Sequence, residues 1–114
     1  MSDNTTTIAQ LKEQFKQFVK ERNWEQFHNP KSTSMNIVAE AAELMELFMW
    51  VESERSHTIV DTKRQEIENE VADIVFALFD FCNHMHIDIT KAVEHKMKRN
   101  AEKYPAQQNK GCMV

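Results

Sequence analysis

The sequence predicts an all-α domain, and three observations lead to that expectation. The chain has 114 residues, enough for one domain with a modest core that oligomerisation would enlarge. It contains one Gly and two Pro, which disfavours a turn-rich sheet architecture. Apolar residues recur at helical spacing through four segments. We expect a four-helix bundle over residues 8–104, with tails over 1–7 and 105–114.

The first helix is predicted from Thr7 to about Arg22. Its apolar stripe consists of Ile8, Leu11, Phe15, Phe18 and Val19. The threonines before it can cap the free amides of the first turn. Residues 23–30 lose the period and end in Asn-Pro, which disfavours helix and indicates an ordered aromatic loop.

The second helix is predicted to begin within residues 32–34 and to run to about Glu54, with its apolar residues on one stripe. Residues 53–62 are predicted to be a linker. The third helix, from about 62 to 84, has an apolar arc wide enough to pack on two sides, which favours a subunit interface.

A fourth helix follows after a short break. Asp88 or Thr90 can cap its first turn, and the helix is expected to end near Tyr104, because Pro105 begins a polar tail.

The charge balance limits the choice of partners. The formal net charge is -4, so a duplex nucleic-acid partner is disfavoured, and a small anionic ligand would need a cation. The N-terminus has no signal-peptide pattern, and no apolar run approaches the ~18 residues that cross a bilayer. We expect a cytoplasmic protein without a membrane partner. Cys82 and Cys112 are expected to be free thiols.

Two central helices each carry a pair of acids three residues apart. Glu40 and Glu43 form the first pair, and Glu70 and Asp73 form the second. At 3.6 residues per turn, each pair lies within roughly 60° of apolar neighbours on its helix. All four carboxylates therefore lie on the faces that should be buried.

Burying four carboxylates together costs several kcal/mol each unless they are protonated or a cation is present. Hard oxygen ligands without a nearby His or Cys indicate Mg²⁺ or Mn²⁺, and Mg²⁺ commonly shares the phosphate oxygens of a ligand. The ligand expected on these grounds is a polyphosphate. The competing interpretation is that these acids are solvated and pair with Lys or Arg, as most helical Glu residues do. Two pairs of matching phase favour the metal.

At this point the sequence resembles the MazG-like branch of the all-α NTP pyrophosphatases, in particular the dCTP pyrophosphatase type. The resemblance covers roughly residues 8–105 and depends on four blocks in order, at residues 21–28, 40–50, 70–73 and 96–105. It implies a Mg²⁺-dependent enzyme that cleaves a nucleoside triphosphate to a monophosphate and pyrophosphate. It also implies a homo-oligomer, with a homotetramer as our first expectation and sites that draw on more than one subunit.

The resemblance assigns roles to particular residues. Glu40, Glu43, Glu70 and Asp73 would bind Mg²⁺, and Glu43 or Glu46 would be the candidate general base. The residues expected to enclose the nucleobase are Trp24, Phe27, His28 and Trp50. Lys96 and Asn100, one turn apart on the fourth helix, would hold phosphate oxygens.

Two positions depart from the family pattern. Phe15 stands where dCTP-specific relatives commonly have histidine, and Ala77 where they commonly have tyrosine. A deoxynucleotide such as dCTP, in a nucleotide-pool house-cleaning role, is still the expected substrate, but these changes leave the preference for base and sugar open.

Two other functions compete with this one. A di-iron carboxylate protein would need Glu-x-x-His on two helices, and only Glu25 and His28 have that spacing. A non-enzymatic helical interaction module would predict no turnover.

Overall fold

The computed structural model describes residues 1–111, and the regular secondary structure among these residues is helical, with no strand. The all-α prediction is confirmed. None of the described helices has the length and apolar character to span a membrane. The helices are α1 (Ile8–Glu21), α2 (Pro30–Glu46), α3 (Ser56–Thr62), α4 (Arg64–Met85), α5 (Ile89–Lys103) and α6 (Ala106–Asn109), with 3-10 turns at Glu25–Phe27 and Ser53–Arg55.

Helix α1 begins and ends close to the predicted positions. Thr7 caps it in a capping box, in which its side chain accepts from the amide of Gln10 and the Gln10 side chain accepts from the amide of Thr7. Val19 is buried, at 2% exposure. The chain then turns through Asn23, whose φ of 55° is a left-handed conformation that Asn tolerates better than most residues.

The predicted bounds of the second helix were wrong at both ends. Helix α2 begins at Pro30, because Asn29 forms a capping box with Ser32 and proline is well suited to the first helical position. It ends at Glu46 rather than near Glu54. The amides of Leu47 and Phe48 bond three residues back, to Leu44 and Met45, so the last turn tightens out of the α-helix.

The predicted linker over residues 53–62 was also wrong, since it forms a 3-10 turn and α3. The predicted C-terminal tail contains the short helix α6. Cys82 is a half-buried free thiol on α4, and Cys112 lies outside the described residues.

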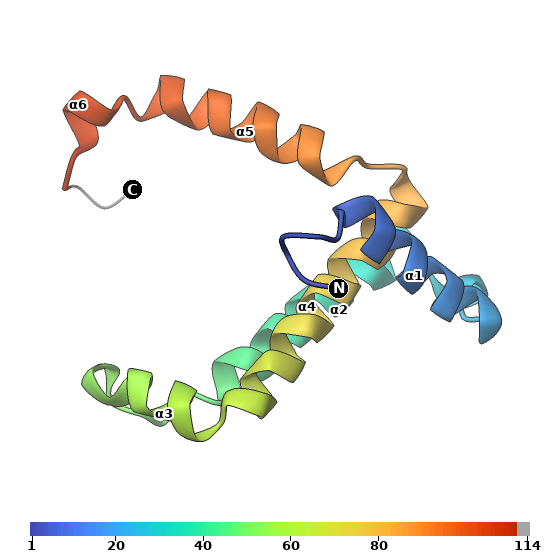
Figure 1. Cartoon of the computed structure of the whole chain (residues 1–114), viewed down its shortest axis with the longest axis horizontal. Helices are drawn as coiled ribbons and strands as arrows, with labels where there is room; N and C mark the ends of the chain where they lie inside the picture. The colour runs from blue at the N-terminus through green and yellow to red at the C-terminus, as the bar shows by residue number, and fades with distance from the viewer. Residues whose placement is uncertain (112–114) are drawn as a thin grey trace.

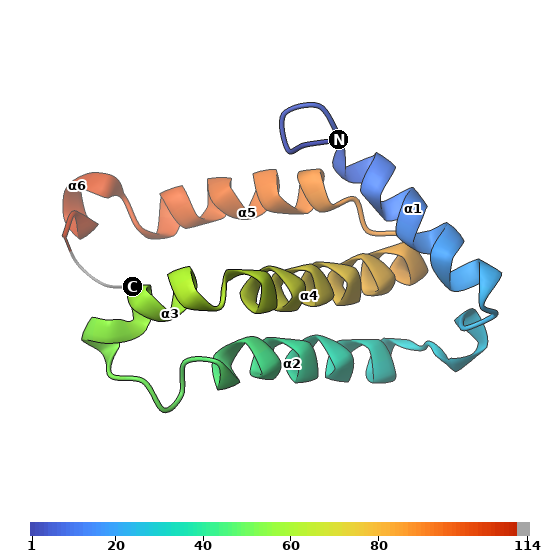
Figure 2. The same ribbon diagram turned by 60° about the horizontal axis from the view of Figure 1, so that its bottom comes forward.

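Helix α4 is the longest element and packs antiparallel to α2 (Figure 2). It ends at Met85, and the residue that caps its C-terminus, His86, is left-handed with a φ of 56°. Of the two predicted caps, Asp88 and Thr90, it is Asp88 that caps α5, by accepting from the amide of Lys91.

Helix α5 stands apart from the pair formed by α2 and α4 in both views of the fold (Figures 1 and 2), and it buries no residue. The radius of gyration is 17.2 Å, whereas a compact domain of this length would have about 13 Å. Among the described residues, Val19, Ala77 and Phe79 are the buried apolar side chains, and many large ones are exposed. The single chain is therefore an open assembly with a thin core.

Candidate functional site

The packing of α2 against α4 brings the four predicted acids together. Glu40 and Glu43 lie on α2, and Glu70 and Asp73 lie on α4. One carboxylate oxygen from each residue can be chosen so that all four lie within 4.8 Å of one another. The i, i+3 spacing on two antiparallel helices produces this convergence, because residues three apart share a helix face.

The electrostatics of this acid cluster call for a cation. The Oε2 atoms of Glu40 and Glu70 are buried and have no hydrogen-bond partner among the described residues. Burial raises the pKa of both carboxyls, and the neighbouring Glu43 and Asp73 raise it further. Orphaned carboxylate oxygens in a donor set made only of oxygen fit Mg²⁺ or Mn²⁺ better than a softer metal.

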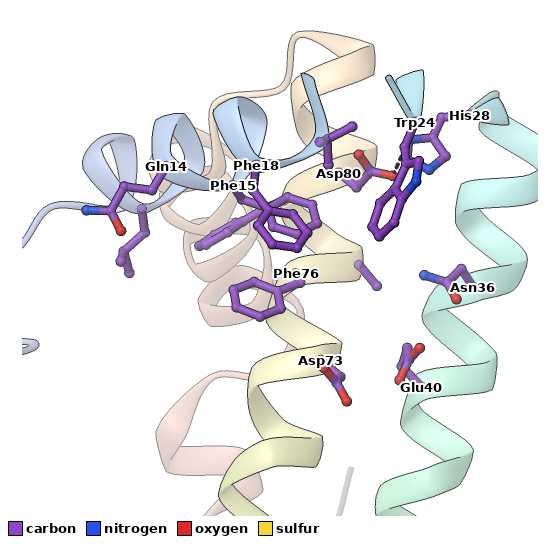
Figure 3. A pocket seen from close by; sticks show the side chains of 14 residues that line it. Gln14, Phe15, Phe18, Trp24, His28, Asn36, Glu40, Asp73, Phe76 and Asp80 are labelled. Atoms are coloured by element: carbon purple, nitrogen blue, oxygen red, sulfur yellow. Dashed lines mark ion pairs between the residues drawn. The ribbon is translucent and has the colours of Figure 1, made fainter. Parts of the chain in front are cut away.

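A cavity of about 590 Å³ opens directly beside the acid cluster, and Glu40 and Asp73 belong to both (Figure 3). Its volume lies within the range of small-molecule sites. The remaining lining is mostly apolar and comes from α1, α2, α4 and the loop before α2. It consists of Leu11, Gln14, Phe15, Phe18, Val19, Trp24, His28, Asn36, Phe76, Ala77, Phe79 and Asp80.

Aromatic rings form one wall of this cavity. Phe15 stacks on Phe76 with ring centroids 4.9 Å apart. It also stacks on Phe18, with ring centroids 6.1 Å apart. Trp24 meets Phe18 edge to face, with centroids 5.8 Å apart. Flat aromatic faces beside the acid cluster are suited to holding a planar, partly apolar ring system.

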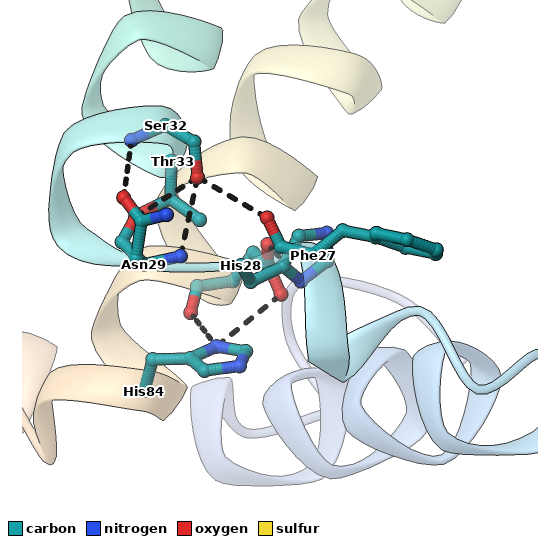
Figure 4. Close-up of polar contacts among 7 residues, drawn as sticks. Phe27, His28, Asn29, Ser32, Thr33 and His84 are labelled. Carbon is teal, nitrogen blue, oxygen red and sulfur yellow. Dashed lines mark hydrogen bonds and ion pairs between the residues drawn. The ribbon is translucent and has the colours of Figure 1, made fainter.

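The loop before α2 is fixed by its hydrogen bonds (Figure 4). The hydroxyl of Ser32 reaches the carbonyl of Phe27, and the hydroxyl of Thr33 donates to the carbonyl of Asn29 at 2.8 Å. His28 is thereby held against α4, with its Nδ1 2.9 Å from Oδ2 of Asp80. The end of the cavity remote from the acid cluster therefore carries the polar pair of His28 and Asp80.

Several predicted residues lie where a ligand in this cavity would reach them, and others do not. Trp24 and His28 line the cavity. Phe27 is 66% exposed and Trp50 is 90% exposed, and neither lines it. Glu46 is the exposed last residue of α2 and lies outside the acid cluster.

The predicted phosphate ligands lie elsewhere in the single chain. Lys96 and Asn100 are on α5, which stands apart, and both are exposed. Together with Arg99, Glu102 and Lys103 they line a separate depression on the surface of that helix.

The sequence interpretation missed Asn36 and Asp80, both of which line the cavity. Their spacing from the acids of the cluster could have identified them. Asn36 lies four residues before Glu40, and Asp80 lies seven after Asp73, so each shares a helix face with an acid of the cluster. An acid between Phe79 and Phe81 is also unusual in an apolar arc.

Comparison with known proteins gives a consistent picture. A sequence model of the MazG-like family matches residues 35–113. The chain is 32% identical over 107 residues to dCTP pyrophosphatase 1 of Rattus norvegicus, and 31% identical over 102 residues to dCTP pyrophosphatase 1 of Homo sapiens. These alignments cover 92% and 88% of this chain, but only 63% and 60% of the relatives. The chain thus spans just under two thirds of the length of these curated relatives.

A solved structure is also similar. The crystal structure of a pyrophosphatase from Archaeoglobus fulgidus matches with a TM-score of 0.84 and 30% sequence identity. The match covers 92% of this chain and 98% of the other. The similarity therefore extends over nearly the whole fold of both proteins.

Proposed function

Because this chain belongs to the MazG-like family, we propose that it is a Mg²⁺-dependent pyrophosphohydrolase that converts a nucleoside triphosphate and water to a nucleoside monophosphate and pyrophosphate. One observation carries the proposal: four carboxylates converge beside a cavity walled by aromatic rings. Such an arrangement offers a cation for a triphosphate and an apolar slot for a base in adjoining positions.

The four acids of the cluster are the proposed metal ligands. Glu40, Glu43, Glu70 and Asp73 would hold Mg²⁺, with Mn²⁺ as the alternative ion. When bound, the metal would offset the charge on the triphosphate and on the attacking and leaving oxygens. The protein then has to position the reactants, so no covalent intermediate is required.

A base near the acid cluster would take the proton from the attacking water. Glu43 and Glu46 are the proposed candidates, because Glu43 belongs to the acid cluster and Glu46 lies one turn from it on α2.

The aromatic cavity would hold the nucleobase. Trp24 and His28 line it, so they would contact the base directly. The high exposure of Phe27 and Trp50 supports a different role, in which they would close the site from a neighbouring subunit.

The phosphate ligands proposed on α5 also require a neighbouring subunit. Lys96 and Asn100 would bind phosphate oxygens at the site of another copy, because α5 packs little on its own chain. The thin core and the exposed apolar side chains support the same arrangement. We propose a homotetramer built as a dimer of dimers.

The substrate would be a deoxynucleotide such as dCTP, by similarity to relatives that carry the name dCTP pyrophosphatase 1. The enzyme would act as a house-cleaning enzyme on the nucleotide pool of the cytoplasm. The net charge of -4 supports a small-molecule substrate rather than a nucleic acid.

The test is to incubate the protein with each dNTP and NTP and Mg²⁺ and to separate the products by anion-exchange chromatography. We expect a monophosphate and pyrophosphate in equal amounts, and no products when EDTA is present. Stepwise release of inorganic phosphate would reject the proposed cleavage to pyrophosphate, and no turnover of any nucleotide would reject the proposal and favour a non-enzymatic interaction module.

A further inference from the structure

Asp80 is an acid of the cavity that the metal centre does not use. It lies on α4, seven residues after Asp73, and is 7% exposed. Its neighbours on the cavity wall include Val19 and Phe79, which are also buried. A nearly buried carboxylate among apolar side chains needs hydrogen-bond donors, because burial removes the water that would otherwise solvate it.

The protein supplies the Asp80 carboxylate with fewer hydrogen-bond donors than it can accept from. Nδ1 of His28 lies 2.9 Å from Oδ2, while Nδ1 of His84 lies 3.6 Å from Oδ1. That nitrogen of His84 is closer to the backbone carbonyl of Asp80, at 2.9 Å. Burial raises the pKa of Asp80, and the two histidines oppose that rise. A carboxylate has about four acceptor positions, so Asp80 keeps capacity for a further donor from the cavity.

The position of Asp80 matches one particular part of a nucleotide. Seven residues of helix separate it from Asp73 by about 10 Å along the same wall. Both residues line the cavity, with Asp73 at the acid cluster and Asp80 beside Trp24 and His28 (Figure 3). A nucleotide with its triphosphate at the acid cluster would therefore direct the edge of its base toward Asp80.

Resting on the proposed function, we propose that Asp80 is a specificity-determining residue that selects bases with an exocyclic amino group. The amino group of cytosine or adenine would donate to the carboxylate. Uracil, thymine and hypoxanthine have a carbonyl at the corresponding position, which repels a carboxylate oxygen and leaves both acceptors unpaired.

The wild-type protein tests this directly through two pairs of nucleotides, dCTP against dUTP and dATP against dITP. Each pair changes an amino group to a carbonyl and keeps the ring size, so the two pairs distinguish pyrimidine from purine recognition. We expect kcat/KM to favour the amino member about tenfold or more in at least one pair. Calorimetric binding of dCMP and dUMP without metal should give the same order, independently of turnover.

Asp80→Asn supplies the matching variant, since an amide of the same size can donate to a carbonyl. We expect the ratio of kcat/KM for dCTP over dUTP to fall about tenfold, with activity on dUTP retained. His84→Asn is the control, because His84 contacts Asp80 but does not line this cavity. That variant should keep the wild-type ratio. Circular dichroism establishes that both variants fold.

Two results would overturn the assignment of Asp80. One is a wild-type protein that releases pyrophosphate equally from amino and carbonyl nucleotides in both pairs. The other is a folded Asp80→Asn variant that loses activity on all nucleotides in the same proportion. Absence of pyrophosphate from every nucleotide would instead overturn the proposed function, and tighter binding of dCMP than of dUMP would still support a role for Asp80 in recognition.

Discussion

The rings of Phe15 and Phe76 lie almost parallel, with an interplanar angle of 6° and centroids 4.9 Å apart. This contact joins α1 to α4 and forms a wall of the cavity. Phe15→Ala should therefore lower the free energy of unfolding by roughly 1–3 kcal/mol and weaken nucleotide binding. Urea denaturation and calorimetry measure the two effects. Phe27→Ala, at a side chain 66% exposed, should change the free energy of unfolding by only about 0.5 kcal/mol. Equal losses of stability in the two variants would contradict the packing role of Phe15.

Removal of metal should change how stability depends on pH. Glu40 and Glu70 have a raised pKa in the folded chain, so the folded state binds their protons more tightly than the unfolded state does. Their stabilising contribution is complete below about pH 4.3, the value for unfolded Glu, and is lost as pH rises through the raised pKa. The Tm of the metal-free protein should therefore fall as pH rises through this range.

Magnesium should reverse this loss, because it binds the ionised carboxylates. Thermal unfolding in EDTA and in Mg²⁺ should therefore diverge as pH rises above about 4.3. Glu70→Gln should reduce the divergence. Identical pH profiles with and without Mg²⁺ would contradict a metal at these acids.

Glu70→Gln should lower the Mg²⁺-dependent kcat by about 100-fold or more, since an amide is a poorer ligand and carries no charge. Its helical circular dichroism should stay close to wild type. Glu66→Gln is a matched control, one turn earlier on α4, exposed and outside the acid cluster. Loss of activity in both variants alike would point to a general effect of charge on α4.

Lys96 and Glu70 are proposed to act in the same site from different subunits. Lys96→Ala should raise KM for the triphosphate about tenfold. If the lysine acts in trans, a mixture of Lys96→Ala and Glu70→Gln chains, unfolded and refolded together, should be more active than either variant alone when the triphosphate concentration is below the KM of Lys96→Ala. The variants refolded separately and then assayed together provide the control. A refolded mixture no more active than that control would show that no site is shared between subunits.

Assembly should depend on the outer face of α4. Leu78 is 42% exposed and Val71, seven residues earlier on the same face, is 46% exposed. Leu78→Glu should shift the mass measured by light scattering from that of four chains toward that of one, because a charge at an apolar interface remains unpaired. A wild-type protein that runs as a monomer would reject the tetramer.

The parts of the fold that could be predicted from sequence are those set by local periodicity and caps. Thr7 and Asp88 are good caps at the start of periodic segments, and the structure uses both. The end of α2 was misjudged because the apolar pattern continues through Phe48 and no glycine or proline marks the break. Its beginning was misjudged because Asn29-Pro30 is compatible with a cap followed by the first helical residue.

The acid cluster was accessible to sequence reasoning for a different reason. Charged side chains are unusual on the apolar face of a helix. When two helices each carry a pair of acids at equivalent positions on that face, a common binding site is indicated. The convergence of Glu40, Glu43, Glu70 and Asp73 follows that reasoning. The contact of His28 with Asp80 joins a loop to a helix more than fifty residues away, and periodicity contains no information on such a pairing.

The most direct test of the account is a crystal structure of the protein grown with Mn²⁺, with anomalous diffraction used to locate the ion. The account predicts an anomalous peak between α2 and α4, within coordination distance of carboxylate oxygens of the acid cluster. An anomalous map without a peak at Glu40, Glu43, Glu70 and Asp73, in crystals that contain Mn²⁺ elsewhere, would contradict it.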